Sequence, residues 1–135
     1  MTEYEAVIST AQDEASRGRY KEAYNTLARA LWLGGPSDQE CRHRRGLYAY
    51  EVAHSRLDTL SESPTPEETL IKAGCWLSRS EAYLMSAAEG VDDTTREKIE
   101  RELARTKQEQ DRFRQLCRDL NLDVFVAATE AAEGD

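Results

Sequence analysis

Residues 11–36 read AQDEASRGRYKEAYNTLARALWLGGP, and they set the arrangement of the whole chain. Apolar and small side chains recur every three or four residues on both sides of Gly18, which is the spacing of one face of an α-helix. Glycine tolerates the backbone conformation of a tight turn, and the Gly-Gly-Pro sequence at 34–36 ends the second periodic segment. The stretch therefore predicts two antiparallel helices, over residues 3–17 and 19–33.

The remaining sequence is also typical of helices. Alanine occurs 17 times, whereas valine, isoleucine and phenylalanine number five, three and two, a composition that favours helices over strands. Capping boxes, in which Ser or Thr precedes Glu by three residues, mark four helix starts: Thr2/Glu5, Ser37/Glu40, Thr65/Glu68 and Thr94/Glu97. With the breaks at 61–64 and 90, they predict three further helices, over 37–60, 66–89 and 93–120.

We therefore expect an all-α fold built of antiparallel helical hairpins. At 135 residues the chain is long enough for one domain, which we place at residues 1–121. Residues 122–135 begin with apolar side chains and end in acidic and small ones, so we expect a short docked segment and a frayed acidic tail.

A more specific pattern lies within the first helix pair. Its positions are Ala11, Gly18, Tyr20, Glu22, Ala23, Leu27, Ala30, Leu31, Leu33 and Pro36. This pattern resembles one tetratricopeptide repeat, with a good match over residues 4–36 and a weaker one over 37–90. The resemblance implies an array of two hairpins closed by a long C-terminal capping helix, and a function in binding other proteins.

The resemblance also implies a binding groove. In this family the first helix of each pair lines a concave ligand face, which places five residues here toward a groove: Glu5, Ile8, Gln12, Ala15 and Ser16. Ile8 and Gln12 stand where the members that clamp C-terminal carboxylates carry Lys and Asn. That ligand specificity is therefore not expected here.

Charge narrows the choice of partner. A net charge of −8 disfavours binding along a nucleic-acid backbone, and the one dense basic run is Arg42-His43-Arg44-Arg45. This run either is a solvated face or contacts an acidic segment, from a partner protein or from the chain's own tail. We expect a non-catalytic adaptor or scaffold that binds a peptide or helix of a partner protein, with these contact residues: Ile8, Gln12, Trp32, Arg42 and Arg45.

Two alternatives come from other residues. Tyr48, Tyr50, Trp76 and Tyr83 either belong to the core or line a pocket between the third and fourth helices, as in a small-molecule sensor or sequestering protein. Five apolar residues of the last helix follow a heptad spacing with Thr106 and Gln110 at its centre: Ile99, Leu103, Phe113, Cys117 and Leu120. That seam belongs to a capping helix or to a homo-oligomer.

The sequence contains no pattern that indicates a metal or redox site, catalysis or a membrane span. Cys41, Cys75 and Cys117 are far apart and lack the Cys-x-x-Cys spacing of metal or redox sites, so we expect reduced thiols and neither metal nor cofactor. Because no catalytic motif occurs, we expect no enzyme activity. No apolar stretch approaches the length of a membrane span, and we expect a cytoplasmic protein.

Overall fold

The computed structural model describes residues 2–33 and 38–122, and within them it is helical and contains no strand. The helices are α1 (Glu3–Ser16), α2 (Tyr20–Leu33), α3 (Asp38–Asp58), α4 (Pro66–Ala87) and α5 (Asp93–Asp119), with a 3₁₀ turn, η1 (Leu60–Glu62). The all-α class is thereby confirmed. Residues 123–135, for which we expect a docked segment and acidic tail, lie outside the described residues, as does Ser37.

The starts of α1 and α5 show how local side chains fix the helix ends. Thr2 accepts a hydrogen bond from the Glu5 amide at 3.1 Å, and the Glu5 carboxylate accepts one from the Thr2 amide, which confirms the first capping box. The cap of α5 differs from the prediction, because Asp92 accepts from the Thr95 amide at 2.7 Å in place of a Thr94/Glu97 box. Asp is as good an N-cap residue as Thr, and here it comes first along the chain.

The start of α4 differs in a similar way. Thr65 precedes Pro66 as predicted, but its side chain makes no capping hydrogen bond. Instead the Ser63 hydroxyl accepts from the Thr65 amide at 3.1 Å and lies 2.8 Å from the Thr69 hydroxyl. The side chain of Ser63 therefore orders the turn that leads into α4, and the predicted capping box at Thr65/Glu68 is not formed.

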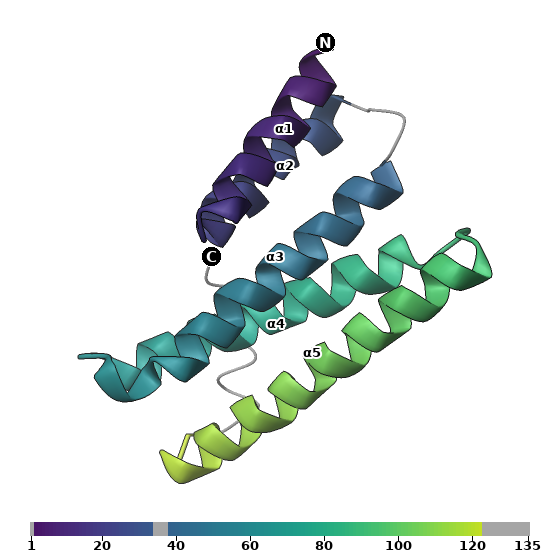
Figure 1. Ribbon diagram of the computed structural model, residues 1–135. Helices are drawn as coiled ribbons and strands as arrows, with labels where there is room; N and C mark the ends of the chain where they lie inside the picture. The colour runs from purple at the N-terminus through teal and green to yellow at the C-terminus, as the bar shows by residue number, and fades with distance from the viewer. Residues whose placement is uncertain (1, 34–37, 123–135) are drawn as a thin grey trace.

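Each helix packs mainly on the helix that precedes or follows it in the chain. Figure 1 shows α1 and α2 antiparallel at the top, with α3, α4 and α5 alternating in direction below them. The most extensive packing joins α3 to α4, while α2 contacts α3 and α5 contacts α4. Within the described residues, no helix is long and apolar enough to cross a membrane.

Small residues stand where helices approach closely. Ala11, Ala23 and Ala30 are fully buried, as expected of a tight first hairpin, and Gly18 has the positive φ of +77° that its turn requires. Two helical glycines that the sequence analysis did not single out matter equally. A Cβ on Gly46 would lie 2.7 Å from Leu84 Cγ, and one on Gly74 would lie 2.6 Å from Phe113 Cζ.

The apolar seam of α5 packs against α4 of the same chain, as expected of a capping helix, which is the first of the two alternatives for this seam. Ile99, Phe113 and Cys117 are buried, Leu103 is half-buried, and Leu120 alone of the five is exposed. At the polar centre, the hydroxyl groups of Thr106 and Ser80 lie 3.1 Å apart, and both residues are fully buried. The buried hydroxyl group of Thr106 therefore has a hydrogen-bonding partner on α4 of the same chain.

Candidate functional site

Three surface hollows are formed by residues of chemical interest. The first lies between α1 and the start of α3 and has a volume of about 370 Å³. It is lined by Thr2, Tyr4, Glu5, Ile8, Ser9, Gln12 and Glu40. We call it the α1–α3 groove. It brings together Glu5, Ile8 and Gln12, three of the five residues that the sequence analysis placed toward a groove.

The floor of the α1–α3 groove is apolar and its rim is charged. Tyr4 and Ile8 are half-buried and pack against the core. Arg44 of α3 reaches the rim, where its guanidinium lies 2.9 Å from the Glu40 carboxylate. With the Gln12 amide turned so that its oxygen faces Arg44, that oxygen accepts two hydrogen bonds, at 3.1 and 3.0 Å. The rim therefore carries more acidic than basic groups.

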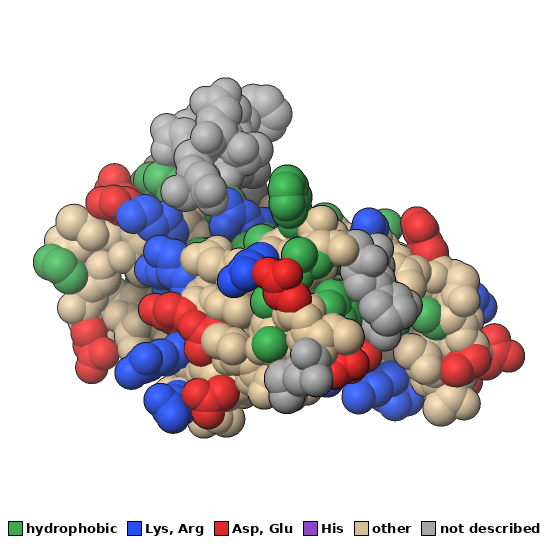
Figure 2. Space-filling model, turned by 90° about the horizontal axis from the view of Figure 1, so that it is seen from above, with side chains coloured by type: hydrophobic (Ala, Val, Ile, Leu, Met, Phe, Trp, Pro, Cys, Tyr) green, Lys and Arg blue, Asp and Glu red, His purple; other side chains and the backbone are tan. Residues whose placement is uncertain are grey.

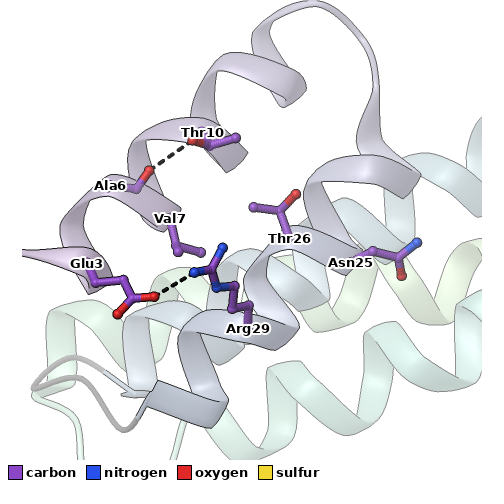
Figure 3. A pocket seen from close by; sticks show the side chains of 7 residues that line it. All are labelled: Glu3, Ala6, Val7, Thr10, Asn25, Thr26 and Arg29. Carbon is purple, nitrogen blue, oxygen red and sulfur yellow. Dashed lines mark hydrogen bonds and ion pairs between the residues drawn. The ribbon is translucent and has the colours of Figure 1, made fainter.

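Trp32 lies at the same end of the molecule as the α1–α3 groove. Its side chain is 89% exposed and Leu33 beside it is at the border of exposure. An ion pair of 2.5 Å between Arg29 and Glu3 ties this end of α2 to the start of α1. Figure 3 shows that pair at one end of a second hollow, of about 500 Å³, which has Val7 in its wall. Its Thr10 hydroxyl already donates to the Ala6 carbonyl at 2.9 Å.

The basic run 42–45 does not form one surface. Arg42 donates to the Ser86 hydroxyl at 2.7 Å, His43 lies 2.6 Å from the Glu102 carboxylate, and Arg44 pairs with Glu40. Because successive residues of a helix point about 100° apart, these four neighbouring side chains have different partners.

Of the residues expected to contact a partner, Arg45 differs most from the prediction, because it is buried. It is only 8% exposed, and its Nε donates to the Tyr24 carbonyl at 3.1 Å while Nη1 donates to the Tyr83 hydroxyl. Its guanidinium carbon lies 3.8 Å from the centre of the Tyr24 ring. Arg45 therefore belongs to the core, and it is withdrawn as a surface group for neutralising an acidic partner.

The aromatic side chains expected to line one pocket belong to three separate clusters. Trp76 and Tyr83 both meet Tyr24 edge-on, with ring centres 4.9 and 6.0 Å apart. Tyr48 lies 6.1 Å from Tyr20, and Tyr50 stacks on a different side chain, His54, at 5.6 Å. An aromatic pocket made of all four residues is thus not formed.

Two further polar clusters connect α3 to α5. His54 lies 3.1 Å from the Glu109 carboxylate and 3.2 Å from that of Asp58, and Arg112 lies 2.8 Å from Asp58. The His43–Glu102 pair forms the second contact. Among the described residues, no group of three or more His, Cys, Asp or Glu side chains is arranged to hold a metal ion.

A third hollow lies between α2, α3 and α4, and we call it the cationic cavity. It has a volume of about 170 Å³. The cations in its lining are Lys21, Arg56, Lys72 and Arg79, accompanied by Asn25, Trp76 and Cys75. The described lining contains no carboxylate. Figure 2 shows one face of the molecule, on which Lys and Arg side chains are interspersed with Asp and Glu.

The sequence analysis missed the cationic cavity because its residues form no run. Lys21 and Asn25 are four apart on α2, and Lys72, Trp76 and Arg79 lie four and three apart on α4, so each set shares a helix face. That spacing is the feature of the sequence that could have indicated a shared polar face on each helix. Only the packing of three helices joins the two faces and adds Arg56.

Comparison of the chain with known protein families, with curated proteins and with solved structures finds no match.

Proposed function

We propose that this protein is a non-catalytic protein–protein interaction module that binds a peptide or helix of a partner in the α1–α3 groove. The observation that carries the proposal is the combination of an apolar floor, formed by Tyr4 and Ile8, with the exposed Trp32 at the same end of the molecule. An apolar groove that accepts one face of an amphipathic helix is typical of helix-in-groove recognition.

Trp32 is the proposed anchor. Tryptophan is enriched among the residues whose truncation weakens an interface most, because it buries a large apolar area and keeps one hydrogen-bond donor. In this chain the ring is almost fully in water, so a partner that covers it gains the whole of that area. Ile8 supplies the second apolar contact, and Gln12 a polar one at the rim.

The charge of the rim revises the expected chemistry of the partner. The sequence analysis expects an acidic segment that contacts Arg42 and Arg45, but Arg45 is buried and Arg42 is bound to Ser86. Glu5 and Glu40 border the groove, and Arg44, the cation that the described residues place at its rim, pairs with Glu40. We therefore propose an amphipathic partner segment with apolar side chains on one face and Lys or Arg beside them.

Selection from a library of random peptides on the immobilised full chain tests this function. We expect enrichment of amphipathic, basic sequences. Ile8→Glu and Trp32→Ala should weaken the binding of a selected peptide about tenfold or more, because each removes an apolar contact from the proposed interface. Met85→Ala is the matched control, since Met85 is a 57% exposed apolar side chain on α4, and it should leave affinity unchanged. Equal binding to all four proteins contradicts the proposal.

A further inference from the structure

Arg44 connects the two walls of the α1–α3 groove. It binds two of the residues that line the groove, Gln12 of α1 and Glu40 of α3. Its Nε and Nη2 donate to one carboxylate oxygen of Glu40 at 3.2 and 2.9 Å. With the Gln12 amide oxygen turned toward it, the guanidinium also donates to α1 at 3.1 and 3.0 Å. A single cationic side chain therefore engages both walls.

The surroundings of Arg44 hold it in this position as a charged group. Burial lowers the pKa of Arg44, but hydrogen bonds with Glu40 and Tyr48 and the charge of Glu40 outweigh that effect, so the pKa is raised. Tyr48 is itself buried, whereas 28% of the Arg44 side chain is exposed. In the free protein, the guanidinium therefore compensates the charge of Glu40.

Glu40 is nevertheless open to exchange of its partner. Its side chain is 55% exposed, and ion pairs of this spacing in water stabilise a helix only slightly. A Lys or Arg of a segment lying in the groove would meet Glu40 where water is displaced, and a charge pair is stronger there. Arg44 and that cation would then compete for the same carboxylate.

We propose that Arg44 is an internal competitor of the partner: it occupies Glu40 in the free protein, and a Lys or Arg of the bound segment displaces it. Glu40 is then the residue that selects basic partners. This inference rests on the proposed function of the groove. It adds that the site is partly occupied before a partner arrives, which lowers the apparent affinity by the fraction of molecules in which Glu40 is taken.

Arg44→Gln tests the competition on a peptide selected with the wild-type chain. The ion pair with Glu40 alone would change affinity about twofold. Because Arg44 has two further hydrogen-bonding partners, we expect Arg44→Gln to strengthen binding about fivefold. Glu40→Gln should weaken binding by a similar factor, since it removes the selecting carboxylate. Isothermal titration calorimetry at fixed pH and ionic strength measures both changes.

Arg17→Gln is the matched control for charge. Arg17 forms a pair of the same spacing with Asp13 on α1, at 3.4 Å, and neither residue lines the groove. The substitution removes the same charge and should leave the affinity unchanged. If Arg44→Gln and Arg17→Gln have equal effects, the gain comes from the net charge of the protein and the competition is wrong.

Combining the two groove substitutions separates competition from the shape of the groove. In the Glu40→Gln background no carboxylate remains to compete for, so adding Arg44→Gln should have little effect on affinity. An undiminished gain in that background means that Arg44 obstructs the groove by its bulk or by repulsion alone, which overturns the inference. Circular dichroism checks that each variant keeps the helical content of the wild-type chain.

The Nε–H group of Arg44 reports displacement in the unmodified chain. In a ¹⁵N-labelled sample its signal should move, as peptide is added, toward the position that it has in free Glu40→Gln. The Nε–H of Arg45 donates to the Tyr24 carbonyl in the core, and its signal should stay fixed. An Arg44 signal that is unchanged at saturating peptide overturns the displacement.

Ile8→Glu distinguishes failure of this inference from failure of the proposed function. If Ile8→Glu leaves the affinity of the selected peptide unchanged, the groove is not the binding site and both proposals are wrong. If Ile8→Glu weakens binding while Arg44→Gln and Glu40→Gln have no effect, the groove stands and the internal competitor alone is wrong.

Discussion

Arg45 shows that the charge of a side chain does not decide its place in the fold. Its planar guanidinium stacks on Tyr24 and donates to a carbonyl and a hydroxyl group, an arrangement that an ammonium group cannot reproduce. We therefore expect Arg45→Lys to lower the free energy of unfolding by about 2 kcal/mol, measured by urea denaturation.

The control for Arg45 is an arginine whose partner is in water. Arg17 pairs with Asp13 at 3.4 Å on the surface of α1, and both side chains are about 60% exposed. Arg17→Lys should change the free energy of unfolding by less than about 0.5 kcal/mol. Equal losses at the two positions would show that the aromatic contacts of Arg45 contribute nothing beyond its charge.

The sequence could not reveal the place of Arg45, because it stands in a run with Arg42 and Arg44 that looks solvated. Nothing local distinguishes the three arginines. Arg42 and Arg45 differ because each meets another helix, through contacts with residues 44 and 21 positions away in the chain, whereas Arg44 pairs with Glu40 on its own helix. The exposure of Trp32, in contrast, could be predicted. Trp32 lies off the face of α2 that carries Tyr24 and Leu27, and its side chain is exposed in the structure.

At the scale of the helices, the contact between α4 and α5 depends on Gly74. An added methyl group would meet the buried ring of Phe113, so we expect Gly74→Ala to lower the free energy of unfolding. The overlap should cost about 1–3 kcal/mol, against a gain in helix propensity of about 1 kcal/mol. Adding Phe113→Leu should recover part of the loss. If Gly74→Ala is as stable as Ser78→Ala, an exposed site on α4, the two helices are less closely packed than described.

The start of α5 should make stability depend on pH. The backbone hydrogen bond from Thr95 lowers the pKa of Asp92, because it favours the ionised carboxylate. A lowered pKa in the folded state stabilises the fold above the unfolded-state value, and that contribution is lost as the pH falls through the folded-state value. Asp92→Asn keeps a capping acceptor without the charge.

Comparison of these two proteins isolates the titration of Asp92. Between neutral pH and about pH 3, the free energy of unfolding of the wild-type chain should fall more steeply than that of Asp92→Asn, because the unfolded pKa is about 3.9. Thermal or urea denaturation at each pH measures the difference. Parallel curves for the two proteins would show that the cap carries no electrostatic contribution.

Over the whole molecule, the sequence predicted the helices, which depend on local patterns, but it did not predict the contacts that form when the helices pack together. The five helices follow from periodicity, caps and breakers that lie within each segment, and their ends agree with the prediction to within a few residues. The seam of α5 was recognised, but its partner was not, because an apolar stripe does not say whether α4 or a second chain covers it. The cationic cavity required three helices in their final places.

The helices should also differ in how readily they open. Among its larger contacts α1 packs on α2 alone, and it buries only Val7 and Ala11, whereas α4 packs between α3 and α5 and buries eight residues. Because local opening is easiest where few apolar contacts must break, amide hydrogen exchange in native conditions should give α1 an opening free energy about 2 kcal/mol or more below that of α4.

This difference bears on the proposed groove, which α1 forms with the start of α3. A peptide bound there would contact α1 in its folded state only, so it should slow exchange in α1 more than in α4. Ile8→Glu should remove that protection while Met85→Ala retains it. Equal opening free energies for α1 and α4 in the free protein would mean that the five helices unfold as one unit, and that binding at α1 must stabilise the whole chain.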